Sequence, residues 1–238
     1  SLLAGGKRIR PVLCLATGEA LGRGPDELVD AACALELVHT FSLVHDDLRR
    51  GRPSAHVRFG EDVAILAGDA LLTEAFRLAL AYPAPDVARV LADATLGMIG
   101  GQYLDVTTDG GLDADGLAEL HALKTGRLIR ASVLAATAVA GLGEAEREPW
   151  AALGAELGLL FQIVDDLLDA TATTQELGKT AGKDEAAGKV TYVSLHGLER
   201  ARALADETRA RVEERLAALP VDTTVLAELA GSIRDRRA

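Results

Sequence analysis

The sequence predicts an all-α protein, a bundle of long helices around a central cavity, formed as a single domain over residues 1–238. Three observations predict this fold class. Long segments are rich in Ala and Leu, no stretch alternates apolar and polar residues as a strand would, and the seven prolines fall near expected segment boundaries. Hydrophobic residues make up 49% of the chain, which is enough to bury a large core.

Helical periodicity recurs along the whole chain, with Gly or Pro between the segments. Helices are expected near residues 11–22, 26–47, 58–81, 86–107, 114–141, 145–171, 191–218 and 223–237. Within the fifth, Leu128 to Gly141 is apolar almost all round, which places it inside the bundle. Gly100 and Gly101 are expected to break a helix, and Pro149 is expected at a helix boundary.

Composition excludes several classes of function. A formal net charge of -11 argues against nucleic acid as a partner. The chain shows neither a secretory signal nor an apolar run of the about 18 residues needed to span a membrane, so a cytoplasmic location is expected. Cys14 and Cys33 lie in apolar helical patterns and are expected to be two buried free thiols.

The segment Phe161 to Lys179 has acidic residues at positions where a core helix would have leucine. Gln162, Asp165, Asp166 and Asp169 recur at three- and four-residue steps and therefore share one helical face. Carboxylates one turn apart, roughly 6 Å, repel by about 3 kcal/mol at an effective dielectric near 20, so a proton, a cation or a metal must offset the repulsion. Oxygen ligands alone suit Mg²⁺. A solvated acidic face is the alternative.

A second acidic segment runs from Leu35 to Pro53. His39 and Asp46 lie seven residues apart and share a face, and Asp47 follows at the helix end. Arg49, Arg50 and Arg52 follow these carboxylates closely, and Arg binds phosphate oxygens through paired hydrogen bonds. Together the two residue types predict a site for a metal-bridged diphosphate. Internal Asp–Arg ion pairs, and a core role for His39, remain the alternatives.

Cations also gather at three other places. Lys7, Arg8 and Arg10 precede a helix start set by Pro11, which indicates an anion site or a solvated basic turn. Lys124 and Thr125 place a cation and a hydroxyl inside a long helix. A Gly-rich loop is a candidate lid over a bound phosphate. It carries three cations: Lys179, Lys183 and Lys189.

These segments together carry a resemblance to a known family. The motifs are GGKRIRP at 5–11, HDD and LRRGRP at 45–53, FGEDVAILAGDALL at 59–72, GGQYLD at 100–105, KTG at 124–126, FQIVDDLLD at 161–169 and GKDEAAGKVTY at 182–192. In this order they resemble the trans-isoprenyl diphosphate synthases of the polyprenyl synthetase family, close to the bacterial farnesyl and geranylgeranyl diphosphate synthases. The resemblance covers essentially the whole chain and implies the isoprenoid synthase type of fold.

The resemblance also implies roles for individual residues. It assigns metal binding to Asp46, Asp47, Asp165, Asp166 and Asp169. It assigns the isopentenyl diphosphate site to Lys7, Arg10, His39 and Arg50. It assigns the allylic diphosphate site to Arg49, Lys124, Thr125, Gln162 and Lys179, and Lys189 is added as a further substrate contact. The residues expected to take part directly in catalysis are Asp46, Asp47, Lys124, Thr125, Gln162 and Asp165.

The implied reaction is an ionisation, condensation and elimination. Three Mg²⁺ ions and the cations stabilise departing pyrophosphate, the isopentenyl double bond attacks the allylic cation, and an apolar tunnel excludes water. The family also leads us to expect a homodimer. No nucleic acid and no membrane span are expected.

One segment departs from the family pattern. Asp47 is followed directly by Leu48, so about eight residues of the family pattern, including the last aspartate of the first motif, are absent. Either the given sequence omits a loop, or the protein carries a deletion; matching flanks favour omission. The start at Ser1 likewise predicts that an N-terminal helix is missing from the given chain. A non-catalytic subunit of a heteromeric prenyl synthase is one alternative function, and a metal phosphohydrolase is a poorer one because the histidines are scattered.

Product length is expected to depend on Phe41, Ser42 and Val38. Phe41 lies five residues before Asp46, where the family's shorter-chain enzymes often carry an aromatic residue. A ring in a close-packed bundle blocks a growing prenyl tail. Farnesyl diphosphate (C15) is therefore the first expectation and geranylgeranyl diphosphate (C20) the second, and Phe41→Ala is expected to lengthen the product.

Overall fold

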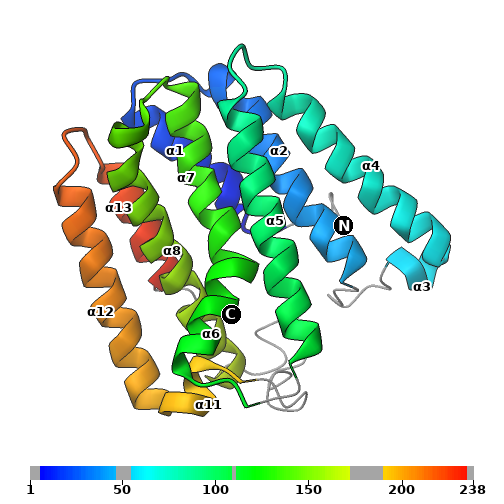
Figure 1. The fold of residues 1–238 in the computed structure, drawn as a ribbon. Coiled ribbons are helices and arrows are strands. Elements are labelled where there is room, and N and C mark those ends of the chain that lie inside the picture. The colour runs from blue at the N-terminus through cyan, green and yellow to red at the C-terminus, as the bar shows by residue number, and fades with distance from the viewer. Residues whose placement is uncertain (1–5, 47–54, 109–110, 172–189, 235–238) are drawn as a thin grey trace.

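The computed structural model describes residues 6–46, 55–108, 111–171 and 190–234, and the regular structure in these ranges is entirely helical (Figure 1). The predicted all-α class is confirmed. The helices are α1 (Ile9–Ala20), α2 (Pro25–His45), α3 (Ala55–Phe59), α4 (Glu61–Ala79), α5 (Asp86–Thr107), α6 (Ala114–His121), the π-helical turn η1 (Ala122–Gly126), α7 (Arg127–Val139), α8 (Glu144–Thr171), α11 (Tyr192–His196), α12 (Leu198–Ala217) and α13 (Thr224–Arg234).

Three of the predicted segments are divided. Gly60, with φ of 89°, separates α3 from α4, and Gly197, with φ of 79°, separates α11 from α12. A backbone with such positive φ is readily adopted only by glycine. The third division is η1, which lies between α6 and α7 without interrupting the helical path.

Successive long helices alternate in direction. In Figure 1, α2, α5, α8 and α13 run downward, while α1, α4, α7 and α12 run upward. We call the end at which α2, α5 and α8 finish the lower end. Short connections join antiparallel neighbours, as is usual in helical bundles.

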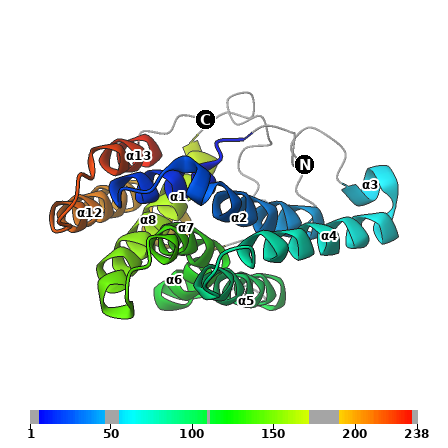
Figure 2. The same cartoon turned by 90° about the horizontal axis from the view of Figure 1, so that it is seen from above.

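The central helix is α7, as its all-round apolar sequence predicts. It packs against α1, α2, α5 and α8, and Figure 2 shows it among these helices. Ile129 and Val133 belong to a core shared with α8 and α12. Leu128 and Ala135 belong to a second core shared with α2 and α5. Because two cores meet on opposite faces of α7, the helix needs apolar residues all round.

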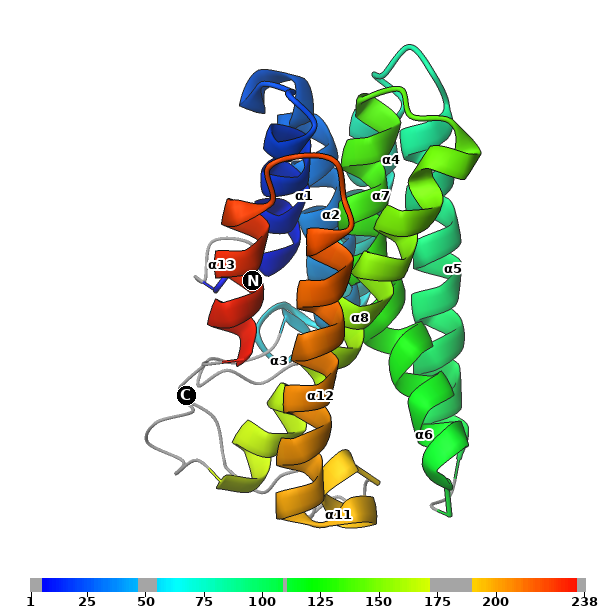
Figure 3. The ribbon, with the colours of Figure 1, turned by 90° about the vertical axis from the view of Figure 1, so that its left-hand side faces the viewer.

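The outer helices differ in how they are covered. Figure 3 shows α12 lying over α8, and α13 packs against α12, α8 and α1. On the other side α4 packs chiefly on α2, and its buried residues are all small: Ala64, Gly68, Ala75 and Ala79. The larger apolar side chains of α4 therefore point away from the core, and several are exposed.

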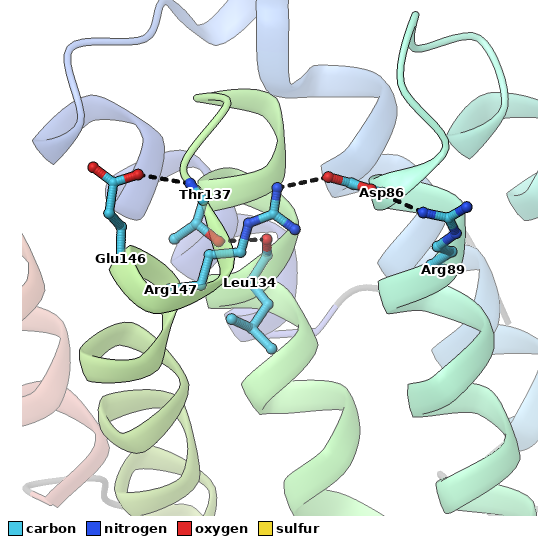
Figure 4. A network of polar contacts seen from close by, with 7 residues as sticks. Asp86, Arg89, Leu134, Thr137, Glu146 and Arg147 are labelled. Atoms are coloured by element: carbon cyan, nitrogen blue, oxygen red, sulfur yellow. Dashed lines mark hydrogen bonds and ion pairs between the residues drawn. The ribbon is translucent and has the colours of Figure 1, made fainter.

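Polar contacts fasten the upper end of the bundle (Figure 4). The Arg147 guanidinium on α8 donates to Asp86 at the start of α5 over 2.7 Å, and Arg89 lies 3.5 Å from the other oxygen of that carboxylate. The hydrogen bond from Arg147, together with the charges of Arg147 and Arg89, holds the pKa of Asp86 below its ordinary value. This end is remote from the predicted site.

Three sequence-based expectations are wrong. Gly100 and Gly101 do not break a helix, because α5 continues through Thr107. Pro149 lies inside α8 instead of at its boundary. Cys33 is exposed, whereas Cys14 is buried and burial raises its pKa to about 12. Apolar residues occur on every face of α2, so the sequence did not show that the face carrying Cys33 is exposed.

Among the described helices, α2 alone is long and apolar enough to cross a membrane, and 56% of its most apolar stretch is buried within the bundle. Such burial is typical of a core helix in a helical bundle.

Candidate active site

The alternation of helix directions brings acidic and cationic residues to the lower end of the bundle. Asp46 caps the end of α2, Asp105 lies in the last turn of α5, and Asp165 lies in the last two turns of α8. Lys124 lies in η1, which directly precedes α7, and Arg10 lies in the first turn of α1; α1 and α7 both begin toward this end. Segments far apart in sequence thus contribute opposite charges to one region.

The acidic face on α8 is present as predicted. Asp166 and Asp169 are buried, with 4% and 6% of their surface exposed, and Gln162 and Asp165 are half-buried. Asp166 accepts hydrogen bonds from Nε2 of Gln162 and from the backbone N–H of Tyr192, each over 2.8 Å. Asp165 and Asp169 are one turn apart and offer carboxylates on the same face.

Lys124 and Thr125 lie in η1, a feature that the sequence did not predict. A π-helical turn inserts one extra residue into a helix and occurs frequently at functional sites. The Lys124 ammonium pairs with Asp105 over 2.6 Å. Two glycines allow η1 to approach its neighbours: a Cβ at Gly101 would lie 2.3 Å from the Lys124 backbone nitrogen, and one at Gly158 would lie 2.9 Å from the Gly126 Cα.

The first acidic segment is only partly described. Asp46 is exposed at the C-cap of α2, and its N–H donates to the Ser42 carbonyl over 2.8 Å. His39, seven residues before Asp46 and on the same face of α2, is half-buried. Several predicted site residues lie outside the described ranges: Asp47, Arg49, Arg50, Lys179, Lys183 and Lys189.

Lys7 and Arg10 lie on either side of Arg8, whose backbone conformation is unusual. Arg8 has φ of 48°, a left-handed conformation that non-glycine residues rarely adopt, and it is the N-cap of α1. Its guanidinium forms an ion pair with Glu36 on α2. Lys7 is exposed on one side of Arg8, and Arg10 is buried on the other. The pair therefore ties the start of α1 to the helix that carries His39.

The predicted chain-length residues occupy different faces of α2. Phe41 packs its ring edge against His45, with centroids 4.8 Å apart, and Nε2 of His45 lies 3.3 Å from the Ile65 carbonyl on α4. Phe41 and His45 therefore share the face that meets α4. Val38 is fully buried, and the Ser42 hydroxyl donates to the His39 carbonyl over 2.8 Å, so Ser42 folds back onto its own helix.

Three residues near these groups were missing from the predicted site: Asp105, Glu36 and Tyr192. Tyr192 is buried, and its ring lies 5.4 Å from that of His121 on α6. Burial, with the nearby Asp166 charge, raises the pKa of Tyr192 to about 12. Asp105 and Tyr192 each belong to a segment already recognised as a motif, which is the signal that pointed to them.

The donor chemistry fits a hard divalent cation. Within the described residues, no three His, Cys, Asp or Glu side chains already converge as a metal site. Asp165 and Asp169 offer carboxylate oxygens, and Mg²⁺ characteristically takes one or two carboxylates and completes its shell with water and substrate phosphates. The predicted metal ligands on α8 therefore carry donors of the right type, and both oxygens of Asp166 also accept hydrogen bonds.

A cavity of about 170 Å³ lies elsewhere on α8. Its lining residues are Val164, Leu167, Leu168, Thr171, Arg202 and Arg234. At 100° per residue, the α8 members of this lining lie on the side of the helix opposite the acidic face. This cavity is therefore separate from the acidic face, and the predicted tunnel stays a prediction.

The fold and this lower-end region define an all-α protein with a candidate acidic, cation-flanked diphosphate site. Comparison with known proteins agrees. The family model for polyprenyl synthetase matches residues 1–229. A geranylgeranyl pyrophosphate synthase 11 from Arabidopsis thaliana is 45% identical over 239 aligned residues, which cover 91% of this chain and 67% of that protein. The chain spans about two thirds of the length of the curated relatives it matches.

Solved structures give the same result. A crystal structure of a geranylgeranyl pyrophosphate synthase superposes with a TM-score of 0.92 at 26% identity, covering 100% of this chain and 90% of that one. A polyprenyl synthase from Caulobacter crescentus, complexed with calcium and isoprenyl diphosphate, gives a TM-score of 0.87 at 29% identity, covering 99% and 86%. The chain belongs to the polyprenyl synthetase family.

Proposed function

We propose that the protein is a trans-prenyltransferase that condenses isopentenyl diphosphate with an allylic diphosphate. The observation that carries this proposal is the arrangement of Asp46, Asp165 and Lys124 at one end of a polyprenyl synthetase fold. Carboxylates on two helices are suited to hold divalent cations against a diphosphate, and the nearby cations are suited to bind its oxygens.

The chain's own residues have separable roles in this proposal. Lys124, Thr125 and Gln162 hold the allylic diphosphate, and Lys7 and Arg10 hold the isopentenyl diphosphate. Asp165 and Asp169, with Asp46 across the site, orient the metal–diphosphate complex. Bound Mg²⁺, in the three-ion form that we expect, supplies Lewis-acid stabilisation of the departing pyrophosphate.

We further propose geranylgeranyl diphosphate (C20) as the main product. Relatives named as geranylgeranyl synthases support this length. The structure offers a physical reason: at 100° per residue, Phe41 points about 140° away from Asp46 around α2. Ser42 and Val38 lie closer to the Asp46 direction, and Ser42 is small. Farnesyl diphosphate (C15) is the second candidate, favoured by the presence of an aromatic residue at position 41.

A direct assay tests both statements. The full-length protein is incubated with Mg²⁺, isopentenyl diphosphate and either dimethylallyl, geranyl or farnesyl diphosphate, and the prenyl chain is measured. Extension of farnesyl diphosphate to C20 supports the proposed product. Products that stop at C15 would favour the second candidate, and no condensation with any primer would favour a non-catalytic subunit.

We also propose a homodimer formed through α4 and α5. Exposed apolar side chains line both helices, between 47% and 70% exposed: Val63, Ile65, Leu66, Leu96, Ile99, Tyr103 and Val106. An apolar surface of this kind characterises a protein interface. Val106→Glu is expected to yield monomers in sedimentation equilibrium, whereas Val225→Glu on α13 serves as a matched control. A wild-type monomer would contradict the proposal.

The proposed location is the cytoplasm. Cys14 and Cys33 are both free thiols, and Cys33 is exposed. A reducing compartment keeps such a thiol from forming disulfides. Fluorescence microscopy of the tagged full-length protein tests this location, and accumulation in another compartment would contradict it.

A further inference from the structure

The imidazole of His45, at the end of α2, lies directly over Gly68 of α4. A Cβ added at Gly68 would overlap this ring, and its three nearest atoms would be Nε2, Cδ2 and Cε1 of His45. Nε2 also lies 3.3 Å from the Ile65 carbonyl oxygen, a contact in which a protonated Nε2 donates. Gly68 is buried although its neighbours along α4 are exposed. The His45 ring therefore occupies a space on α4 that only a glycine leaves open.

The same imidazole packs against the ring of Phe41, one turn earlier on α2. The ring centroids are 4.8 Å apart and the ring planes cross at 69°, an edge-to-face arrangement that aromatic rings favour. Helical side chains lean toward the N-terminus of their helix, so a side chain at position i+4 covers the one at position i. His45 is thus held between Phe41 and Gly68, and Phe41 is 8% exposed.

The place of His45 around α2 limits where the Phe41 ring can turn. At 100° per residue, His45 lies about 40° around the helix from Phe41. Ser42 follows at about 100° and Asp46 at about 140°, both on the same side of Phe41 as His45. A Phe41 ring that turned toward the Asp46 side of the helix would have to enter the space that His45 fills.

We propose that His45, held in place by Gly68, determines product length by keeping the Phe41 ring against α4 and out of the path of the growing prenyl chain. The inference rests on the proposed function and its C20 product, and it gives the reason why a Phe at position 41 is compatible with that product. A helical side chain has two accessible χ1 wells. Without the imidazole, the second well opens to Phe41, and the ring turns toward Ser42, where it stops the chain at C15.

Removal of the imidazole is the first test, with chromatography of the dephosphorylated prenyl alcohols as the measurement. In His45→Ala the ratio of C15 to C20 product is expected to rise about tenfold, because a chain that overlaps the ring is disfavoured. His45→Ala combined with Phe41→Ala is expected to restore C20, since no ring remains to turn. His45→Phe keeps a ring over Gly68 and is expected to keep C20. An unchanged product in His45→Ala would overturn the proposal.

Gly68→Ala displaces the same ring without any change in α2. The new methyl group overlaps the far end of the His45 side chain, which can swing away. Alanine also favours a helix more than glycine does, so α4 itself is not weakened. Gly68→Ala is expected to shift the product toward C15 as His45→Ala does, and the double variant is expected to shift it no further. Additive shifts in the double variant would overturn the pairing of these two residues.

Val44→Ala is the matched control on α2. Val44 is buried in the same turn as His45, but it lies about 60° from Phe41 on the other side. This variant is expected to lower Tm and to keep C20 as the main product. If Val44→Ala shifts the product as far toward C15 as His45→Ala does, general loosening of α2 sets the length, and the proposal fails.

The χ1 angle of Phe41 gives a readout that requires no turnover. The chain has four phenylalanines, so ¹³C,¹⁵N-phenylalanine labelling gives four sets of three-bond couplings from Cγ to the backbone nitrogen and carbonyl carbon, and Phe41→Leu assigns one set. Without substrate, we expect one χ1 well for Phe41 in the wild type and a second in both His45→Ala and Gly68→Ala. Unchanged couplings in both variants would overturn the proposal.

These readouts separate the inference from the proposed function. Absence of prenyl transfer by the wild type, with the expected couplings, would count against the proposed function and leave the contact between His45 and Phe41 supported. A wild type that stops at C15 although Phe41 keeps its single χ1 well would refute the link between this ring and product length.

Discussion

The ammonium of Lys124 lies 2.6 Å from a carboxylate oxygen of Asp105, and this ion pair joins η1 to the last turn of α5. Both side chains are largely buried, with 29% and 14% of their surface exposed. The close backbone approach at Gly101 brings the two helices near enough for the contact. Asp105 therefore fixes the position of a cation that we propose binds the allylic diphosphate.

Removal of this carboxylate should affect both stability and substrate binding. Asp105→Asn is expected to cost about 1–3 kcal/mol, because it leaves a partly buried ammonium without its charged acceptor. The KM for the allylic diphosphate is expected to rise more than that for isopentenyl diphosphate. Chemical denaturation and steady-state kinetics measure the two effects. Glu74→Gln breaks an exposed ion pair with Arg77 and serves as control; if both variants behave alike, the buried pair has no special role.

The Arg8–Glu36 ion pair is expected to support isopentenyl diphosphate binding. Arg8 holds a left-handed backbone between Lys7 and Arg10, a conformation that costs of order 1 kcal/mol in a non-glycine residue. Glu36→Gln is expected to raise the KM for isopentenyl diphosphate several-fold. Arg8→Gly keeps the backbone conformation and loses the pair, whereas Arg8→Ala loses the pair and keeps the strain. A larger KM effect in Arg8→Ala than in Arg8→Gly is expected; unchanged KM values in all three variants would refute this role.

Stability at low pH should depend on Asp86. Hydrogen bonds and charge from Arg147, and charge from Arg89, lower its pKa in the folded state below the unfolded value of about 3.9. A carboxyl of this kind stabilises the fold above the unfolded pKa, and the contribution is lost as the pH falls through the folded pKa. The Tm difference between wild type and Asp86→Asn should be constant near pH 5–7 and shrink below about pH 4. A constant difference down to pH 3 would count against this assignment.

The length of the prenyl product tests which face of α2 borders the growing chain. If Phe41 belongs to the α4 contact, Phe41→Ala should leave C20 as the main product, while Ser42→Phe should shorten it to C15 by filling space near the Asp46 direction. If Phe41 closes the tunnel, Phe41→Ala should instead lengthen a C15 product. Chromatography of the dephosphorylated prenyl alcohols separates these outcomes, and Val225→Ala on α13 provides an exposed control.

The sequence predicted the helices and the acidic face of α8 because both depend on local periodicity. It did not predict η1, which packs closely against Gly101 and Gly158 on neighbouring helices, since such contacts join residues far apart in sequence. For the same reason, the contacts of Asp166 were invisible: Tyr192, one of its donors, lies 26 residues away in sequence. The exposure of Cys33 was also missed, because apolar residues all round α2 leave the buried face undetermined.

The predicted site residues divide into those on described helices and those outside the described ranges. Asp46, His39 and Asp165 lie on elements whose directions follow from the alternation of the bundle. Asp47, Arg49 and Arg50 lie outside the described residues, so their assignment remains that of the sequence resemblance.

The most direct test of the central claim is Mg²⁺-dependent prenyl transfer by wild type and by Asp165→Ala, each as the full-length protein. The measurement is the prenyl diphosphate formed from isopentenyl diphosphate and farnesyl or geranyl diphosphate, with Tm recorded alongside. We predict turnover in wild type and its loss by orders of magnitude in Asp165→Ala at an unchanged Tm, because the half-buried carboxylate orients the metal–diphosphate complex. Undiminished turnover in Asp165→Ala would contradict the account.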